Sequence, residues 1–141
     1  MEEDFPTEVQ KIVEPLLSSM GFTLDVIDND VDEGGRKGSV VIYRAQDCKI
    51  QVYHSSREGE INAMIGPLSA PNEHGLYDQS RKWHYFNDFA VEPKLSLEEL
   101  VDKLRDERVN FETTNSWLEW LKTERIARYF DSAHAAIVAG K

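Results

Sequence analysis

Hydrophobic residues in the first twenty positions recur at steps of three and four. This spacing lines one face of an α-helix, so the pattern predicts a helix over roughly 5–20. Asp4 and Gly21 suit its two ends, and Pro15 removes an interior hydrogen-bond donor, which predicts a kink or a local break. The apolar positions of this helix are Phe5, Val9, Ile12, Val13, Leu16, Leu17 and Met20.

After Gly21 the apolar period changes from 3.6 to two, which predicts a strand over 22–27. The polar run 29–38 contains Gly34-Gly35 and is typical of an exposed loop. Short connections join the strands that follow, so the chain is expected to form an antiparallel meander. One face of this sheet is expected to pack on the core and the other to be partly exposed to solvent. The further strands are expected over 39–44, 48–54 and 60–65.

The segment from Gly66 to Arg81 has prolines and a glycine but no sustained period. It is longer than most connections, and loops of this length are often functional. It leads into the aromatic segment 82–89, which is expected to form a short fifth strand or an extended stretch packed by its rings.

Two C-terminal helices are indicated by their capping residues. Ser96-Leu97-Glu98-Glu99 fits a capping box, which predicts a helix that begins there and fades near Glu107. Thr113, Thr114 or Asn115 can cap a further helix with a break near Phe130. Its apolar residues occupy more than one face, as expected of a helix between other elements. The apolar stripe of the helix that begins at Ser96 consists of Leu97, Leu100, Val101 and Leu104.

These elements predict an α+β fold with an N-terminal helix, an antiparallel meander of about four to five strands, and two or three C-terminal helices. The 141 residues, 40% of them hydrophobic, are expected to form a single domain spanning 1–141. The N-terminus is acidic where a signal peptide would be basic, and no apolar run reaches membrane-spanning length. A cytoplasmic location is expected, unless a leader has been removed. Cys48 is the single cysteine, which agrees with a reducing compartment.

The formal charge of −10 excludes general affinity for nucleic acid or anionic membranes, because both require a basic surface. Residues 1–35 hold ten acidic groups against one basic group, Lys11, whereas residues 36–141 hold sixteen against fifteen. The excess is therefore almost wholly N-terminal. It has two interpretations, namely general solubility or a concentrated negative field that steers a basic partner.

Motifs for metal or cofactor chemistry fail in detail. The acidic run that starts at Asp28 resembles a calcium loop, but its sixth position is Glu33 instead of glycine and its twelfth is Ser39. No pair of the four histidines has zinc-ligand spacing, and the glycines do not form a phosphate-binding pattern. We therefore expect no metal, no cofactor and no enzymatic activity.

Three features keep alternatives open. His84 and Asp88, with Tyr85 or Glu73, are the candidate residues of an enzyme of unrecognised type, although packing of the loop on the sheet by Trp83 and His84 is the simpler interpretation. Cys48 lies at an inward-looking strand position, where it is expected to act as a small buried hydrophobe. The pair Trp117 and Trp120 is expected to pack in the core, and its outward-facing member is a candidate anchor for a partner.

The arrangement resembles the small acidic α+β immunity proteins that accompany bacterial polymorphic and contact-dependent toxins. The resemblance spans most of the chain but contains no catalytic or metal signature. The segments that carry it are Gly38-Ser39-Val40-Val41-Ile42-Tyr43, Cys48-Lys49-Ile50-Gln51-Val52-Tyr53, Arg57-Glu58-Gly59-Glu60-Ile61-Asn62, Pro67-Leu68 and Trp83-His84-Tyr85.

The resemblance implies a non-enzymatic inhibitor that neutralises one cognate toxin by occluding its active site. Many such toxins are nucleases with basic clefts, so an acidic partner gains electrostatic steering. The competing hypotheses are the enzyme above and a structural or chaperone-like module that forms a homodimer through its sheet edge or C-terminal helix. The expected partner-binding residues are Asp25, Asp28, Asp30, Asp32, Glu33, Glu73, Asp78, Trp83 and Trp120.

Overall fold

The centre of the molecule is a five-stranded antiparallel sheet with the strand order β1-β2-β3-β4-β5. The structure is a computed structural model that describes residues 4–89, 96–108 and 111–139. β1 and β5 form the two edges, and each strand pairs with the next one along the chain. The α+β fold class and the meander are therefore confirmed. The strands are β1 (Thr23–Asp32), β2 (Lys37–Arg44), β3 (Cys48–Ser55), β4 (Glu60–Pro67) and β5 (His84–Tyr85).

The N-terminal helix is divided in two, as Pro15 predicts. α1 spans Phe5–Ile12 and α2 spans Glu14–Ser19, with Val13 between them. The side chain of Asp4 caps α1 by accepting a hydrogen bond from the backbone N–H of Thr7 at 3.1 Å. Both helices pack against β1 and the first of them also packs against β2, so the acidic N-terminal quarter of the sequence is contiguous in space.

The C-terminal helices begin at the residues that the sequence indicates. Ser96 caps α3 (Leu97–Arg108), and Thr113 caps α4 (Thr114–Leu121) in a capping box with Ser116. α4 continues through a π-helical stretch, η3 (Lys122–Ala127), into α5 (Arg128–Ala139). The helix break that the sequence predicts near Phe130 therefore lies a few residues before it, in η3. A 3-10 turn, η1 (Phe86–Phe89), follows β5 and packs on α5.

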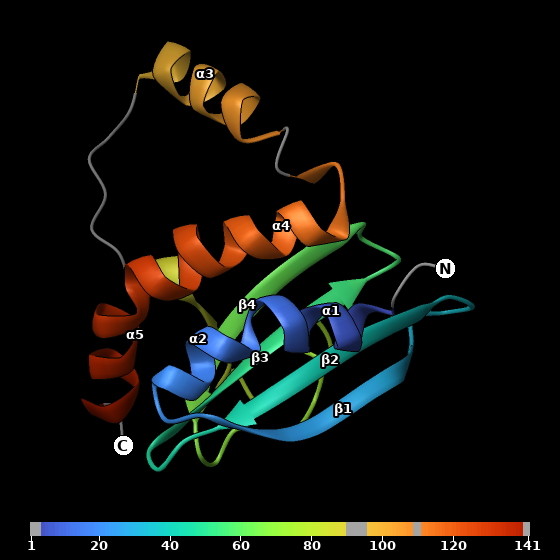
Figure 1. Ribbon diagram of the computed structural model, residues 1–141, viewed down its shortest axis with the longest axis vertical. Helices are drawn as coiled ribbons and strands as arrows, with labels where there is room; N and C mark the ends of the chain where they lie inside the picture. Colours follow the sequence, from blue (N-terminus) through green and yellow to red (C-terminus); the bar gives the residue numbers. More distant parts are fainter. Residues whose placement is uncertain (1–3, 90–95, 109–110, 140–141) are drawn as a thin grey trace.

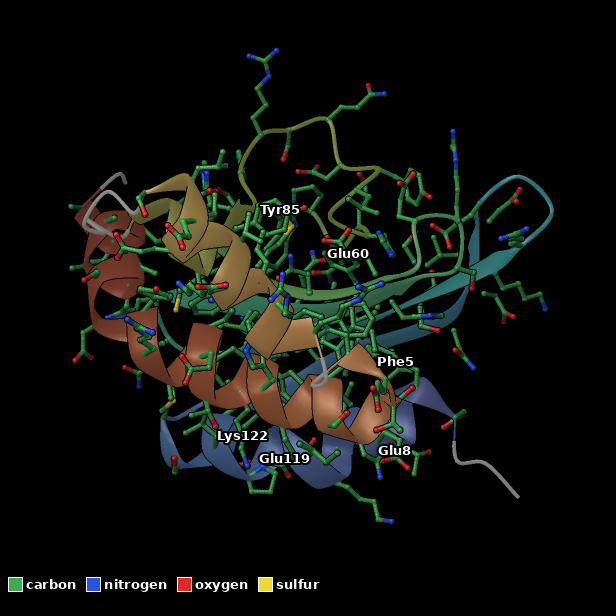
Figure 2. All side chains as sticks on the ribbon, turned by 90° about the horizontal axis from the view of Figure 1, so that it is seen from above. Phe5, Glu8, Glu60, Tyr85, Glu119 and Lys122 are labelled. Atoms are coloured by element: carbon green, nitrogen blue, oxygen red, sulfur yellow. The ribbon has the colours of Figure 1, made fainter. Side chains whose placement is uncertain are left out.

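The sheet is covered on both faces, but by different structures. α1, α2, α4 and α5 lie on one face (Figure 1), where the larger core contains Val41, Tyr43, Ile50 and Leu118. The loop between β4 and β5 lies on the other face, over a smaller core. Figure 2 shows the helical layer and this loop on opposite sides of the sheet. The smaller core consists of Val40, Ile42, Tyr53, Met64, Ala70 and Trp83.

The first hairpin differs from the sequence-based expectation. β1 continues to Asp32, so the expected ten-residue loop 29–38 is reduced to a tight turn. The backbone N–H of Glu33 donates to the carbonyl of Arg36 at 2.9 Å, and Gly34 and Gly35 have φ values of 79° and 100°. Two successive residues with positive φ match the favoured turn of a two-residue hairpin.

Among the described residues, no helix has both the length and the apolar character needed to cross a bilayer.

Candidate protein-binding surface

The exposed edge of β1 carries four aspartates, which we call the β1 acidic strip: Asp25, Asp28, Asp30 and Asp32. All four are exposed. Asp30 pairs with Lys37 at 3.0 Å, and the charge of Asp25 acts on the buried Lys49. Among the described residues Asp28 and Asp32 have no ion-pair partner, and each accepts a hydrogen bond from a nearby backbone N–H. The strip therefore keeps a net negative charge on an open edge.

Three other acidic groups among the described residues of the N-terminal third are used inside the fold. Glu8 and Glu33 are 8% and 5% exposed, and Glu14 accepts a hydrogen bond from the hydroxyl of Tyr43 at 3.0 Å. Asp4 is exposed at the start of α1. Among the described residues of this region, the exposed carboxylates therefore lie mainly on β1.

The strip is accompanied by exposed aliphatic side chains and an irregular backbone. Leu24 and Ile27 are 41% and 45% exposed. The register between β1 and β2 shifts between Leu24 and Val26 and again between Asp28 and Val31. Bulges of this kind make an edge a poor template for another strand. We therefore expect a partner to recognise the side chains of β1 instead of extending its hydrogen-bond ladder.

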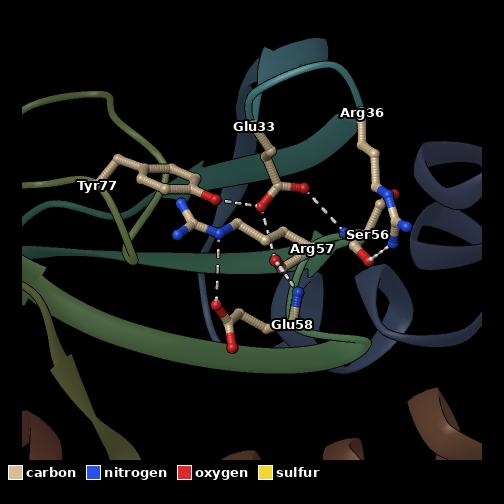
Figure 3. A network of polar contacts seen from close by, with 7 residues as sticks. Glu33, Arg36, Ser56, Arg57, Glu58 and Tyr77 are labelled. Atoms are coloured by element: carbon tan, nitrogen blue, oxygen red, sulfur yellow. Dashed lines mark hydrogen bonds and ion pairs between the residues drawn. The ribbon is translucent and has the colours of Figure 1, made fainter.

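Glu33 is not a surface contact, which corrects its place in the expected partner-binding set. Its carboxylate accepts hydrogen bonds from Ser55 Oγ at 2.6 Å, from the backbone N–H of Ser56 at 2.8 Å and from Tyr77 Oη (Figure 3). Burial alone would raise the pKa of Glu33, but these hydrogen bonds outweigh it and lower the pKa to about 2. Glu33 therefore joins the hairpin turn to the end of β3 and to the long loop.

Gly38 leaves the space that this carboxylate occupies. A Cβ atom at position 38 would lie 2.7 Å from Glu33 Oε1 and 2.9 Å from the carbonyl oxygen of His54. Both distances are shorter than ordinary van der Waals contact. A glycine is therefore required here by the close approach of Glu33 and the neighbouring strand.

The long loop is fixed to the sheet by buried polar side chains. Lys49 Nζ donates to the carbonyl of Ala70 at 2.7 Å and to Asn72 Oδ1 at 2.8 Å. Gln51 donates to the carbonyl of Glu73 at 3.0 Å and accepts from the N–H of Gly75 at 2.8 Å. These contacts make the loop a structured cover over the smaller core.

The expected contacts on this loop divide into buried and exposed residues. Trp83 is 5% exposed and donates from Nε1 to the carbonyl of Pro71 at 2.8 Å, so it packs the loop and is not a surface contact. Glu73 is exposed, and Asp78 is half-buried and accepts two hydrogen bonds from Ser80. Glu73 and Asp78 therefore remain candidates for a partner contact, whereas Trp83 does not.

Trp120 is half-buried on the C-terminal helix. Phe111 meets its ring edge-on with centroids 4.9 Å apart, and the guanidinium of Arg125 lies 4.5 Å from its centroid. Trp117 also contacts Phe111, with centroids 4.8 Å apart. Both tryptophans pack at the margin of the larger core. Only part of Trp120 is left for contact with another molecule.

His84 and Asp88, the residues of the enzyme hypothesis, are placed by β5 and η1. The Asp88 carboxylate accepts a hydrogen bond from the backbone N–H of Tyr85 at 2.9 Å. Tyr85 Oη lies 3.0 Å from Tyr53 Oη, on the loop face of the sheet. These contacts place Tyr85 in β5 and Asp88 in η1, and a backbone N–H occupies one carboxylate oxygen of Asp88.

α3 exposes the apolar stripe that the sequence pattern predicts. Figure 1 shows this helix apart from the sheet and from the other helices. Its capping box and amphipathic period are local features, so they predict the helix correctly without predicting what it packs on. The exposed fractions are 78% for Leu97, 42% for Leu100, 44% for Val101 and 57% for Leu104.

This exposure predicts that the stripe contributes little to folding stability. Leu104→Ala is expected to change the free energy of unfolding by less than about 0.5 kcal/mol, since surface substitutions seldom exceed that amount. Urea denaturation of dilute protein measures it. The fully buried Leu118 provides the comparison, because Leu→Ala in a core costs about 2–5 kcal/mol. A loss of the second size at Leu104 would show that α3 is packed in solution.

A second group of polar residues lies at the start of β3, at the end opposite to the contacts of Glu33. The sequence did not indicate this group. His134 Nε2 on α5 lies 2.8 Å from Asp47 Oδ2 in the turn between β2 and β3. Hydrogen bonding to His134 lowers the pKa of Asp47. The two residues are far apart in the chain, so no local sequence pattern could have predicted their contact. Cys48, next to Asp47, is fully buried as its strand position predicts.

Comparisons of the chain with protein-family models, with curated protein sequences and with solved structures found no match. The functional proposal therefore depends on this chain's own residues and surfaces.

Proposed function

We propose that the protein is a non-enzymatic protein-binding module that uses the β1 acidic strip to bind a basic partner protein. The observation that carries this proposal is the combination, on one open sheet edge, of four exposed carboxylates with the exposed Leu24 and Ile27. Interfaces combine apolar contact with complementary charge in this way. A nucleic acid or an anionic membrane would be repelled by the same surface.

The partner class follows from the sequence resemblance to immunity proteins of bacterial toxin systems. In this role the strip would lie over the basic active-site cleft of one cognate toxin and exclude its substrate. Carboxylates on a rigid sheet suit this task because they are already ordered before binding, so little conformational entropy is lost. Glu33, Lys49 and Gln51 contribute to this rigidity by fixing the hairpin turn and the loop behind it.

Affinity capture from the native cell with a neutralised variant tests the proposal. The variant Asp25→Asn, Asp28→Asn, Asp30→Asn and Asp32→Asn removes four charges and keeps an oxygen acceptor at each position. The control changes four exposed carboxylates elsewhere, Asp102→Asn, Glu112→Gln, Glu119→Gln and Asp131→Asn. Each set breaks one exposed ion pair, Asp30 with Lys37 or Glu119 with Lys122.

The wild type and the control are expected to retain the same basic protein, identified by mass spectrometry, and the neutralised variant is expected to lose it. Retention of that protein by all three would remove the β1 acidic strip from the interface. Recovery of only further copies of the chain would favour the homo-oligomeric alternative.

A further inference from the structure

Three potential metal ligands converge where the turn after β2 meets α5. The ligand atoms of Asp47, Cys48 and His134 all lie within 4.8 Å of one another. The imidazole and the carboxylate are in contact at 2.8 Å, and the Cys48 thiol also hydrogen-bonds the Asp47 carboxylate. One thiol, one imidazole and one carboxylate therefore lie in a single cluster.

The spacing of these atoms is close to what a tetrahedral ion requires. Zinc lies about 2.3 Å from sulfur and about 2.0–2.1 Å from nitrogen or oxygen, so its ligand atoms are about 3.3–3.8 Å from one another. The ligand atoms lie within 4.8 Å of one another, which exceeds this spacing by up to roughly 1 Å, and the 2.8 Å contact between His134 and Asp47 has to lengthen by roughly 0.5 Å. Rotation of half-exposed side chains can supply such a movement, and the side chains of His134 and Asp47 are 34% and 39% exposed.

The surroundings orient the imidazole and leave one side of the cluster open. The ring of Phe130 stacks on His134 with an interplanar angle of 12° and centroids 5.1 Å apart, and Phe22 meets Phe130 edge-on at 6.0 Å. Asp47 and His134 line a hollow of about 330 Å³. Cys48 is fully buried on the other side. Three protein ligands with one open side is the arrangement of zinc sites that keep an exchangeable fourth position.

Simpler roles do not account for all three groups. An Asp47–His134 ion pair alone would join the turn to α5, but it does not require a thiol on the same carboxylate. A nucleophilic cysteine needs access to substrate, and Cys48 is 0% exposed. A buried thiolate ligand needs no such access, because only the ion has to reach it.

We propose that Cys48 Sγ, His134 Nε2 and the Asp47 carboxylate bind one divalent transition-metal ion, Zn²⁺ by the chemistry of the donors, with its fourth coordination position open to the hollow. Mixed sulfur and nitrogen donors favour Zn²⁺ over Mg²⁺ or Ca²⁺. On binding, the Cys48 thiol releases its proton to solvent. The proton on His134 Nε2, which faces the Asp47 carboxylate, also leaves that nitrogen, so that the neutral imidazole binds with its single proton on Nδ1. The ion joins β3 to α5 and thereby stabilises the fold. The inference does not depend on the β1 acidic strip.

Titration of the metal-stripped protein with Co²⁺ tests this site. Because Cys48 is the single cysteine of the chain, a thiolate-to-cobalt charge-transfer band can come only from this residue. The band is expected to saturate at one equivalent, together with visible bands typical of tetrahedral Co²⁺, and Zn²⁺ is expected to abolish both. In a separate thermal scan, Zn²⁺ at about 100 times its Kd should raise Tm by about 5–10 °C.

Variants at the half-exposed ligands separate metal binding from folding. His134→Gln and Asp47→Asn are each expected to weaken Co²⁺ binding at least about tenfold, since even second-shell changes cost that much. Cys48→Ser is expected to remove the charge-transfer band. His84→Asn, outside the cluster, is expected to bind as the wild type does. Absence of the band at equimolar Co²⁺, or an unchanged band in both His134→Gln and Asp47→Asn, would overturn the proposal.

Discussion

Glu33→Ala is expected to lower the free energy of unfolding by about 3 kcal/mol. The substitution leaves the buried Ser55 Oγ and the half-buried N–H of Ser56 without their common acceptor, and each buried unpaired group costs about 1–3 kcal/mol. Tyr77 Oη also loses this acceptor, but its side chain is exposed and can hydrogen-bond to water instead. The loss should be smaller for Glu33→Gln, which keeps one acceptor oxygen. Urea denaturation monitored by tryptophan fluorescence measures both values.

The acid dependence of this effect has a defined sign. The pKa of Glu33 is lowered from 4.5 to about 2, so its contribution is fully present above about pH 4.5 and disappears as the pH falls to about 2. The difference in stability between wild type and Glu33→Gln should therefore shrink across that interval. Asp32→Asn, at the exposed neighbouring position, should change stability by less than about 0.5 kcal/mol at any pH. A larger effect at Asp32 than at Glu33 would contradict the roles assigned to them.

Neutralising the β1 acidic strip is expected to slow association with the captured partner by about 10–100-fold at low ionic strength. Electrostatic steering accelerates association by about 10–1,000-fold, and it depends on the field that the four aspartates produce together. The dissociation rate should change less, because exposed charges act mainly on the encounter. Stopped-flow fluorescence or surface plasmon resonance measures both rates.

The control set Asp102→Asn, Glu112→Gln, Glu119→Gln and Asp131→Asn has the same change in net charge. At an ionic strength of about 0.1 M, where the Debye length is about 10 Å, its association rate should stay within about threefold of the wild-type rate, because charges farther than that from the interface are largely screened. Equal slowing by both sets would show that total charge, and not the β1 acidic strip, drives the encounter.

The sequence predicts most elements of the fold because their signals are local. Pro15 divides the first helix, and Ser96 and Thr113 cap the later ones. Alternating residues define β3 and β4, and an apolar run after the loop defines β2. The extent of β1 was missed because three of residues 29–32 are polar, Asn29, Asp30 and Asp32. An edge strand tolerates polar residues, and pairing with β2 overrides their weak strand propensity.

The sequence predicted the acidic residues of the candidate site but not which of them are exposed. The exposure of a side chain depends on contacts between segments that are distant in the chain. The four aspartates of β1 are exposed, as a partner-binding surface requires. Glu33 has the same acidic character, but it is drawn inward by Ser55 and by Tyr77, which is 44 residues away. Nothing in its sequence neighbourhood distinguishes it from Asp32. The contact of Asp47 with His134 spans 87 residues and depends on how α5 lies against the sheet.

Hydrogen exchange of the complex tests the central claim most directly. As an edge strand, β1 pairs on one side only, so its outward amides exchange readily in the free protein. When the captured partner is bound, exchange in residues 23–36 should slow by about tenfold or more, while exchange in α3 should stay unchanged. Protection confined to α3 or to the C-terminal helix, with residues 23–36 exchanging as in the free protein, would contradict the account.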